Sequence, residues 1–194
     1  MKLILSKIKT YFGKLDKLLL FMCMGIACFA VFIQYTLYEN DISSAVTASQ
    51  YKTQIIAFIA GIVIAMALAA INYKYLAKLW FIYVPLAMGL TLLLFTPLGI
   101  QREGADDIGW LDLGIMTIQP SEILKLAFIL SLAVHLSKVE DRMNEPIHFI
   151  LLCIHGAIPT LLIRQTGDDG SALVFLFIFI CMMFAAGLSW KYLV

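Results

Sequence analysis

Residues 104–135 read GADDIGWLDLGIMTIQPSEILKLAFILSLAVH. A polar loop with acidic residues and glycines leads into Pro120, and the apolar segment that follows carries Glu122 and Lys125 near its start. Charged side chains at the mouth of a membrane helix are costly and commonly mark function. The stretch therefore predicts a membrane helix with a polar site at its entrance.

The composition indicates a membrane protein. Of the 194 residues, 62% are hydrophobic and only 14% are charged, whereas soluble domains contain roughly 45–50% apolar residues. The formal net charge of +1 produces no field that would attract nucleic acid. No metal-ligand spacing, phosphate-binding loop or dinucleotide fingerprint occurs in the sequence. We therefore expect no metal site, no cofactor and no nucleic-acid partner.

Six apolar segments are long enough to cross a bilayer, which requires about 20 residues per helix, with a range of roughly 17–25. They are residues 18–38, 53–71, 79–98, 121–137, 147–163 and 171–188. We therefore expect an all-α polytopic membrane protein, with residues 1–194 forming a single transmembrane domain.

The distribution of lysine and arginine predicts the orientation, because cytoplasmic loops carry the excess of these residues. With the N-terminus inside, ten basic residues fall on the cytoplasmic side, namely Lys2, Lys7, Lys9, Lys14, Lys17, Lys74, Lys78, Lys138, Arg142 and Lys191. Only three fall outside, namely Lys52, Arg102 and Arg164. We therefore place both termini in the cytoplasm and residues 39–52, 99–120 and 164–170 outside.

Glu122 and Lys125 are three residues apart, so their side chains lie on one face of the predicted helix. A carboxylate in the first turn can simply meet the positive end of the helix macrodipole, and a lysine can extend its amine outward to the interface. Beneath an acidic outer loop, the pair also fits one wall of a polar cavity that opens outward. We favour the cavity as the interpretation of the pair.

Other outer residues are candidates for the same cavity. Trp110 is either an interfacial anchor or part of the site. Asp168 and Asp169 precede the sixth apolar segment; helix capping accounts for one carboxylate, and the pair is also available to bind a cation or to pair with Lys125. His155, midway along the fifth segment, is expected to be a hydrogen-bonded core residue rather than a functional one.

The same residues resemble a known family. Gly104-Ala105, Trp110 to Gly114 and residues 119–125 are similar to the GAxRWxxLG loop and the QPSExxK helix start of the SEDS proteins (RodA, FtsW and SpoVE). Residues 164–172 resemble the family's QPDLGTA-type segment, and the sequence GLSW at residues 187–190 resembles its continuation. The resemblance extends over essentially the whole chain, but it reaches only the first six of the family's usual ten helices.

The resemblance implies a partial SEDS bundle and a specific activity. Such proteins are peptidoglycan glycosyltransferases of the bacterial cytoplasmic membrane, which polymerise lipid II, a lipid-linked disaccharide-peptide, on the outer face for cell shape or division. Their implied partners are a class B penicillin-binding protein and membrane lipid. The implied substrate-binding residues are Lys125, which would hold an anionic group, Glu122, which would position it, and Asp168, Asp169, Trp110 and Arg102.

The chain departs from the family pattern at three points. Gly109 stands where a basic residue usually precedes the tryptophan, and Arg102 is the candidate replacement from upstream. The sequence TGDDGS at residues 166–171 replaces QPDLGT, so either aspartate is a candidate for the family's aspartate. The family's catalytic aspartate lies between its seventh and eighth helices, beyond Val194. We therefore assign no catalytic residue and expect the N-terminal part of a longer protein.

Two other functions fit the same features. As a transporter, the protein would use the cavity to move a lipid-linked precursor across the membrane. As a non-catalytic scaffold, it would dock partners of the cell-wall machinery through its helices. Strand formation from lipid II distinguishes the enzyme from both, and lipid translocation without strand formation identifies the transporter.

Overall fold

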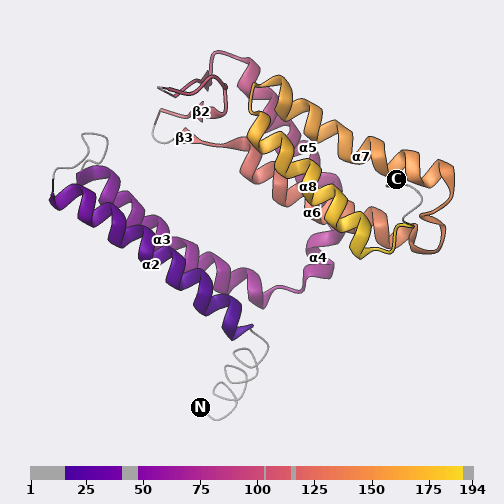
Figure 1. Cartoon of the computed structure of the whole chain (residues 1–194), viewed down its shortest axis with the longest axis horizontal. Helices are drawn as coiled ribbons and strands as arrows, with labels where there is room; N and C mark the ends of the chain where they lie inside the picture. The colour runs from indigo at the N-terminus through magenta and orange to yellow at the C-terminus, as the bar shows by residue number, and fades with distance from the viewer. Residues whose placement is uncertain (1–15, 41–47, 103, 115–116, 190–194) are drawn as a thin grey trace, which may run out of the picture. The chain divides into compact units, whose positions relative to one another are not determined.

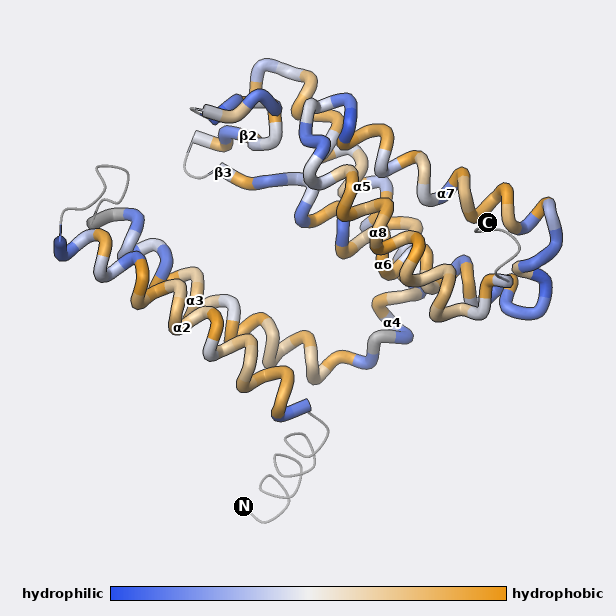
Figure 2. The backbone as a smooth tube through the Cα atoms, in the orientation of Figure 1, coloured by the Kyte–Doolittle hydropathy of each residue, from blue (hydrophilic) through white to orange (hydrophobic). Residues whose placement is uncertain are grey.

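The computed structural model describes residues 16–40, 48–102, 104–114 and 117–189 (Figure 1). The chain divides into two compact units, Met1–Asn72 and Tyr73–Val194. The helices are apolar along most of their length, and hydrophilic residues collect at helix ends and in the connections (Figure 2). This pattern is that of helices whose flanks contact lipid and whose ends meet water.

The first unit contains two long helices that pack side by side, α2 (Lys17–Glu39) and α3 (Ala48–Ala70). Asp16 caps α2, because its carboxylate accepts a hydrogen bond from the Leu19 N–H at 3.0 Å. The Tyr51 ring of α3 lies 5.8 Å from that of Tyr35 and 6.3 Å from that of Tyr38. α3 begins at Ala48 rather than at the predicted residue 53. The Tyr51 contacts show that the start of α3 packs against α2.

The second unit is a helical bundle. Its helices are α4 (Tyr73–Lys78), α5 (Trp80–Leu92), η1 (Leu93–Phe95), α6 (Pro120–Lys138), η2 (Glu140–Arg142), α7 (Pro146–Gln165) and α8 (Asp169–Ala185). α4 lies between the second and third predicted segments, and its Lys74 and Lys78 are among the basic residues placed on the cytoplasmic side.

Helix α6 is the central element of this bundle, since it packs against α5, α7 and α8. Leu124, Phe128 and Leu132 recur every fourth residue and are almost fully buried, as expected for one face of a helix. The Phe128 ring lies 5.6 Å from the ring of Phe175 on α8, which is also fully buried. The core of the unit therefore lies along this face of α6.

Every predicted apolar segment overlaps a helix in the described residues. Four helices are both long and apolar enough to cross a membrane, namely Lys17–Glu39, Gln50–Ala70, Pro120–Lys138 and Pro146–Gln165. The third and sixth predicted segments correspond to shorter apolar helices, Trp80–Phe95 and Asp169–Ala185. The architecture is thus that of a polytopic helical membrane protein, and six complete spans in a single domain remain a prediction.

The third predicted segment, residues 79–98, extends beyond the helix in the structure. α5 ends at Leu92, and the 3-10 turn η1 ends at Phe95. Thr96, with φ −104° and ψ 173°, is already extended, because a residue before proline avoids the helical region and Pro97 follows. The apolar run continues past the helix, so hydropathy alone overestimates the length of this element.

A small antiparallel sheet lies within residues 99–120, where the sequence indicates only an outer loop. It consists of β1 (Gly99–Ile100), β2 (Trp110–Asp112) and β3 (Thr117–Ile118), in that spatial order. Leu111 pairs with Gly99 on one side and Ile118 on the other and is fully buried. Strands this short have no readable alternation of polar and apolar residues, so the sequence pattern does not reveal them.

Helices α7 and α8 approach closely at Gly156. A Cβ atom at this position would lie 2.6 Å from Cδ2 of Phe179 and 2.9 Å from its Cγ. Small residues at helix contacts in membranes allow such close approach. Glycine at residue 156 is therefore required by the packing of the two helices.

We expect Gly156→Ala to lower the thermal unfolding midpoint of the detergent-solubilised protein, at a cost of about 1–3 kcal/mol for overpacking. Gly89→Ala is the matched control in α5, because a Cβ there would meet nothing within 4 Å. Equal midpoints for the two variants would show that the α7–α8 contact tolerates a methyl group.

Candidate functional site

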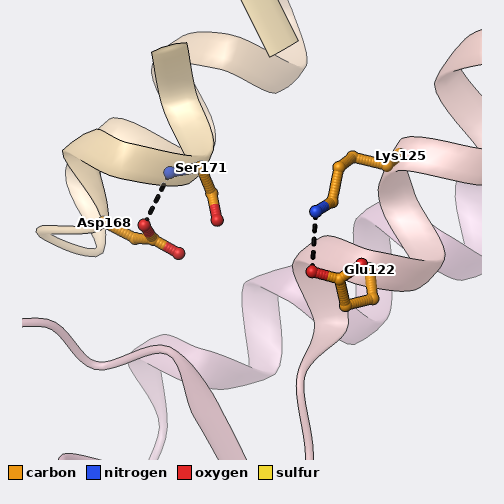
Figure 3. Close-up of polar contacts among 4 residues, drawn as sticks. All are labelled: Glu122, Lys125, Asp168 and Ser171. Atoms are coloured by element: carbon orange, nitrogen blue, oxygen red, sulfur yellow. Dashed lines mark hydrogen bonds and ion pairs between the residues drawn. The ribbon is translucent and has the colours of Figure 1, made fainter. Parts of the chain in front are cut away.

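The first turns of α6 hold an ion pair. Pro120 occupies the first turn of the helix, where its fixed φ suits the start and its missing N–H costs little. The Nζ of Lys125 lies 2.6 Å from Oε1 of Glu122 (Figure 3). The side chain of Lys125 is 18% exposed, and that of Glu122 is 60% exposed. The ammonium is thus drawn toward the helix start, the lysine side chain as a whole is largely buried, and the carboxylate partner stays accessible.

The start of α8 separates the roles of the two aspartates. Asp168 caps the helix, since its Oδ1 accepts a hydrogen bond from the Ser171 N–H at 2.7 Å (Figure 3). Asp169 lies in the first turn, with Oδ1 3.7 Å from Nε of Arg164, and both of these side chains are largely exposed. Asp168 is therefore an ordered structural group, and Asp169 belongs to a solvated surface pair.

Lys125 does not pair with either aspartate. Its partner is Glu122 on the same helix, and no hydrogen bond or ion pair joins it to Asp168 or Asp169 among the residues that the structure describes. The possible pairing across the bundle is therefore absent. The reason is local, because a carboxylate one turn away reaches the lysine without crossing between helices.

The sheet brings Arg102 onto Trp110. The guanidinium carbon of Arg102 lies 3.4 Å from the centroid of the Trp110 ring, within the range of a cation–π contact. A Cβ atom at Gly109 would meet only side-chain atoms, first the carboxylate oxygen of Asp107, so the backbone itself does not exclude a side chain immediately before the tryptophan. A cation reaches Trp110 from upstream, which agrees with the expectation for Arg102.

The sheet loop is attached to the turn between α7 and α8. The Ile108 N–H donates a hydrogen bond to the carbonyl oxygen of Thr166 at 2.9 Å. Gly167 has a φ of +88°, which glycine adopts readily, and a Cβ there would lie 3.3 Å from the Cα of Asp107. This contact holds the loop that carries Trp110 beside the turn that carries Asp168.

The polar groups therefore gather at one end of the second unit. β3 leads directly into α6, and the sheet loop contacts the end of α7, so the Lys125–Glu122 pair, Asp168 and the Arg102–Trp110 pair share this end (Figure 1). The opposite end is formed by α4 and the last turn of α6. This end therefore presents two cations, Lys125 and Arg102, of which Lys125 is paired with a carboxylate.

Ser121 is buried at the start of α6. Neither Ser121 nor Gln119, the residue before Pro120, makes a side-chain capping bond there. The Ser121 hydroxyl is buried and has no hydrogen-bond partner among the described residues. Its burial depends on the sheet and the neighbouring helices, so the sequence carried no signal for it.

A second polar cluster lies within the helices, between α6 and α7. Nε2 of His155 is 3.0 Å from the Ser131 hydroxyl, and Nδ1 of His155 is 3.1 Å from Nδ1 of His135. The Ser131 hydroxyl also lies 3.1 Å from the carbonyl oxygen of Phe128. The donor and acceptor roles of the two imidazoles in these contacts depend on their tautomers. His155 is thus hydrogen-bonded within the bundle, as the sequence predicts.

No group of three or more His, Cys, Asp or Glu residues suited to a metal ion occurs within the described ranges. The candidate site is therefore a binding surface built from Lys, Arg, Glu, Asp and Trp side chains. Fold and site together define a polytopic helical membrane protein whose bundle carries a polar end with charged side chains of both signs.

Comparison with known proteins identifies the family. The chain matches the profile of the cell cycle protein family FtsW/RodA/SpoVE over residues 14–194. It is 31% identical over 191 residues to the probable peptidoglycan glycosyltransferase FtsW of Geobacter sp. (strain M18), covering 92% of this chain and 49% of that protein. It is 26% identical over 188 residues to peptidoglycan glycosyltransferase MrdB of Escherichia coli (strain K12), covering 94% and 47%.

Solved structures share the fold. The rod shape determining protein RodA of Thermus thermophilus superimposes with a TM-score of 0.66 at 26% identity, covering 86% of this chain and 55% of that one. A chain of a peptidoglycan synthase complex gives a TM-score of 0.72 at 23% identity, covering 90% and 48%. The chain therefore belongs to the FtsW/RodA/SpoVE family, and it spans about half the length of the curated relatives it matches.

The two aspartates should differ in their effect on stability. We expect Asp168→Ala to cost about 0.5–2 kcal/mol through loss of the cap and to accelerate hydrogen exchange at the Ser171 amide. Asp168→Asn should retain most of the stability, because asparagine also caps. Asp169→Ala should have a much smaller effect, since exposed ion pairs contribute little. A larger loss for Asp169→Ala than for Asp168→Ala, measured as thermal midpoints, would contradict the assigned cap.

Proposed function

We propose that this protein takes part in polymerising lipid II into glycan strands on the outer face of the bacterial cytoplasmic membrane, together with a class B penicillin-binding protein. Family membership supports the proposal, as do relatives named peptidoglycan glycosyltransferases. The fold shared with a chain of a peptidoglycan synthase complex is consistent with a protein partner.

The observation that carries the proposal is the ion pair at the start of α6. Lys125 is largely shielded from solvent, and its ammonium points to the same end of the bundle as Arg102. Lipid II offers a pyrophosphate at the membrane interface, and a lysine and an arginine at the same end of the bundle suit such a group.

Glu122 gives Lys125 its orientation. The 2.6 Å contact holds the ammonium toward the helix start. A bound phosphate would share the ammonium with Glu122, since an ammonium has three donors. In this proposal Lys125 binds, Glu122 positions, and Arg102, Trp110, Asp168 and Asp169 surround the bound headgroup. None of them is assigned a catalytic role.

The orientation of the bundle agrees with an outer site. Lys74, Lys78 and Lys138 lie at the end of the second unit opposite to the Lys125–Glu122 pair. Because basic residues mark the cytoplasmic side, the polar site then faces outward, where lipid II is consumed.

The test is strand formation from lipid II by the protein reconstituted with its penicillin-binding partner. We expect Lys125→Ala to reduce the rate at low lipid II concentration by about 10–100-fold, as for loss of a charge-assisted hydrogen bond. Lys125→Arg should retain part of the activity, because it keeps the positive charge. Asp106→Ala is the matched control, since this exposed side chain lies on the loop between β1 and β2 and has no assigned role in the site. The rate of the Asp106→Ala variant should stay within about twofold of that of the unchanged protein.

Near-normal activity of both alanine variants would show that Lys125 is not part of the substrate-binding site. Lipid II translocation without strand formation by the active protein would instead identify a transporter. Absence of both activities, with the partner still bound, would identify a scaffold.

A further inference from the structure

A second polar region lies at the opposite end of the second unit. α4, the start of α5 and the last turns of α6 enclose a pocket of about 550 Å³. It lies entirely within this unit, and it is separate from the Lys125–Glu122 site because α6 begins at one region and ends at the other.

Three lysines border this pocket. Lys74 and Lys78 come from α4, four residues apart and therefore on one face of that short helix. Lys138 comes from the last turn of α6, and its Nζ lies 5.8 Å from the centroid of the Trp80 ring. None of the residues that line the pocket is acidic. Lys78 and Lys138 therefore bring positive charge to the pocket, and its lining contains no carboxylate.

The other wall of the pocket is apolar. Leu130, Ala133 and Val134 line it from α6, at the spacing of one helix face. Ser137 follows on the same face, and its hydroxyl donates to the carbonyl of Val134 at 2.9 Å. Along α6 the lining thus changes from apolar to basic within two turns. This gradient matches a molecule with a hydrocarbon part and an anionic head.

We propose that this pocket binds an anionic phospholipid of the cytoplasmic leaflet, with the phosphate beside Lys78 and Lys138 and the adjoining acyl chain against the apolar face of α6. Basic pockets between membrane helices on the cytoplasmic side suit anionic headgroups. The lysines that form the pocket also lie on the side that the positive-inside rule assigns to the cytoplasm. A free phosphate would satisfy the lysines but leave the apolar wall uncovered, so the two-part lining selects a lipid.

The direct test is titration of the purified protein in neutral detergent with phosphatidylglycerol, followed by native mass spectrometry and by the thermal unfolding midpoint. We expect saturable binding that raises the midpoint, and no comparable effect of phosphatidylcholine. Inorganic phosphate or glycerol phosphate at equal concentration should not compete. Equal competition by these soluble anions would establish a free-phosphate site and overturn the lipid assignment.

Matched variants distinguish lipid binding in the pocket from lipid attraction by general surface charge. Lys78→Gln and Lys138→Gln should each weaken phosphatidylglycerol binding about fivefold. Arg142→Gln removes the same charge on the same side of the membrane but outside the pocket, and it should change the affinity less than twofold. An equal loss with Arg142→Gln would show diffuse attraction and overturn the proposal.

The apolar wall is tested independently. Ala133 is exposed, so Ala133→Phe is expected to fold, which the midpoint without lipid verifies, while the larger side chain fills the space for the acyl chain. It should reduce phosphatidylglycerol binding at least fivefold with all lysines present. Unchanged binding in a folded Ala133→Phe protein would show that no acyl chain occupies the pocket.

Discussion

The packing of α6 against α5, α7 and α8 is the contact on which both polar regions of the second unit depend. Leu124, Phe128 and Leu132 bury one face of this helix, which fixes its rotation and height in the bundle. Its first turns then present Lys125 at one end, and its last turn presents Lys138 at the other. The buried apolar face of α6 therefore positions Lys125 and Lys138 at opposite ends of the helix.

The bilayer explains why the charges stand where they do. A charged side chain in the hydrocarbon region is costly, so lysines on membrane helices lie near an end or find a partner. Lys125 does both, since it is one turn inside α6 and pairs with Glu122. Histidine and serine side chains deeper in the bundle bond to one another instead, as Ser131, His135 and His155 do. The Ser131, His135 and His155 side chains are thus paired within the bundle, whereas the lysines lie near the helix ends.

Most helices could be predicted because the hydropathy of each segment is a strong signal that depends only on neighbouring residues. Long apolar runs indicate membrane helices from composition alone, and the Glu122–Lys125 pair follows from a spacing of three residues. The end of the third segment could not be read from hydropathy, since Pro97 stops the helix while the sequence stays apolar. The three short strands were likewise not predicted, because two or three residues carry no periodic pattern.

The sequence by itself determined the class of protein, the helical segments and the ion pair on α6, because these depend on hydropathy and on neighbours within one helical turn. The tertiary structure decided the rest of both sites. Arg102 covers Trp110 only because β1 and β2 pair, and the Trp110 loop meets the Asp168 turn only through Ile108 and Thr166. The basic pocket likewise needs α4 against the end of α6. Such contacts join residues far apart in the chain, so they arise when the helices pack.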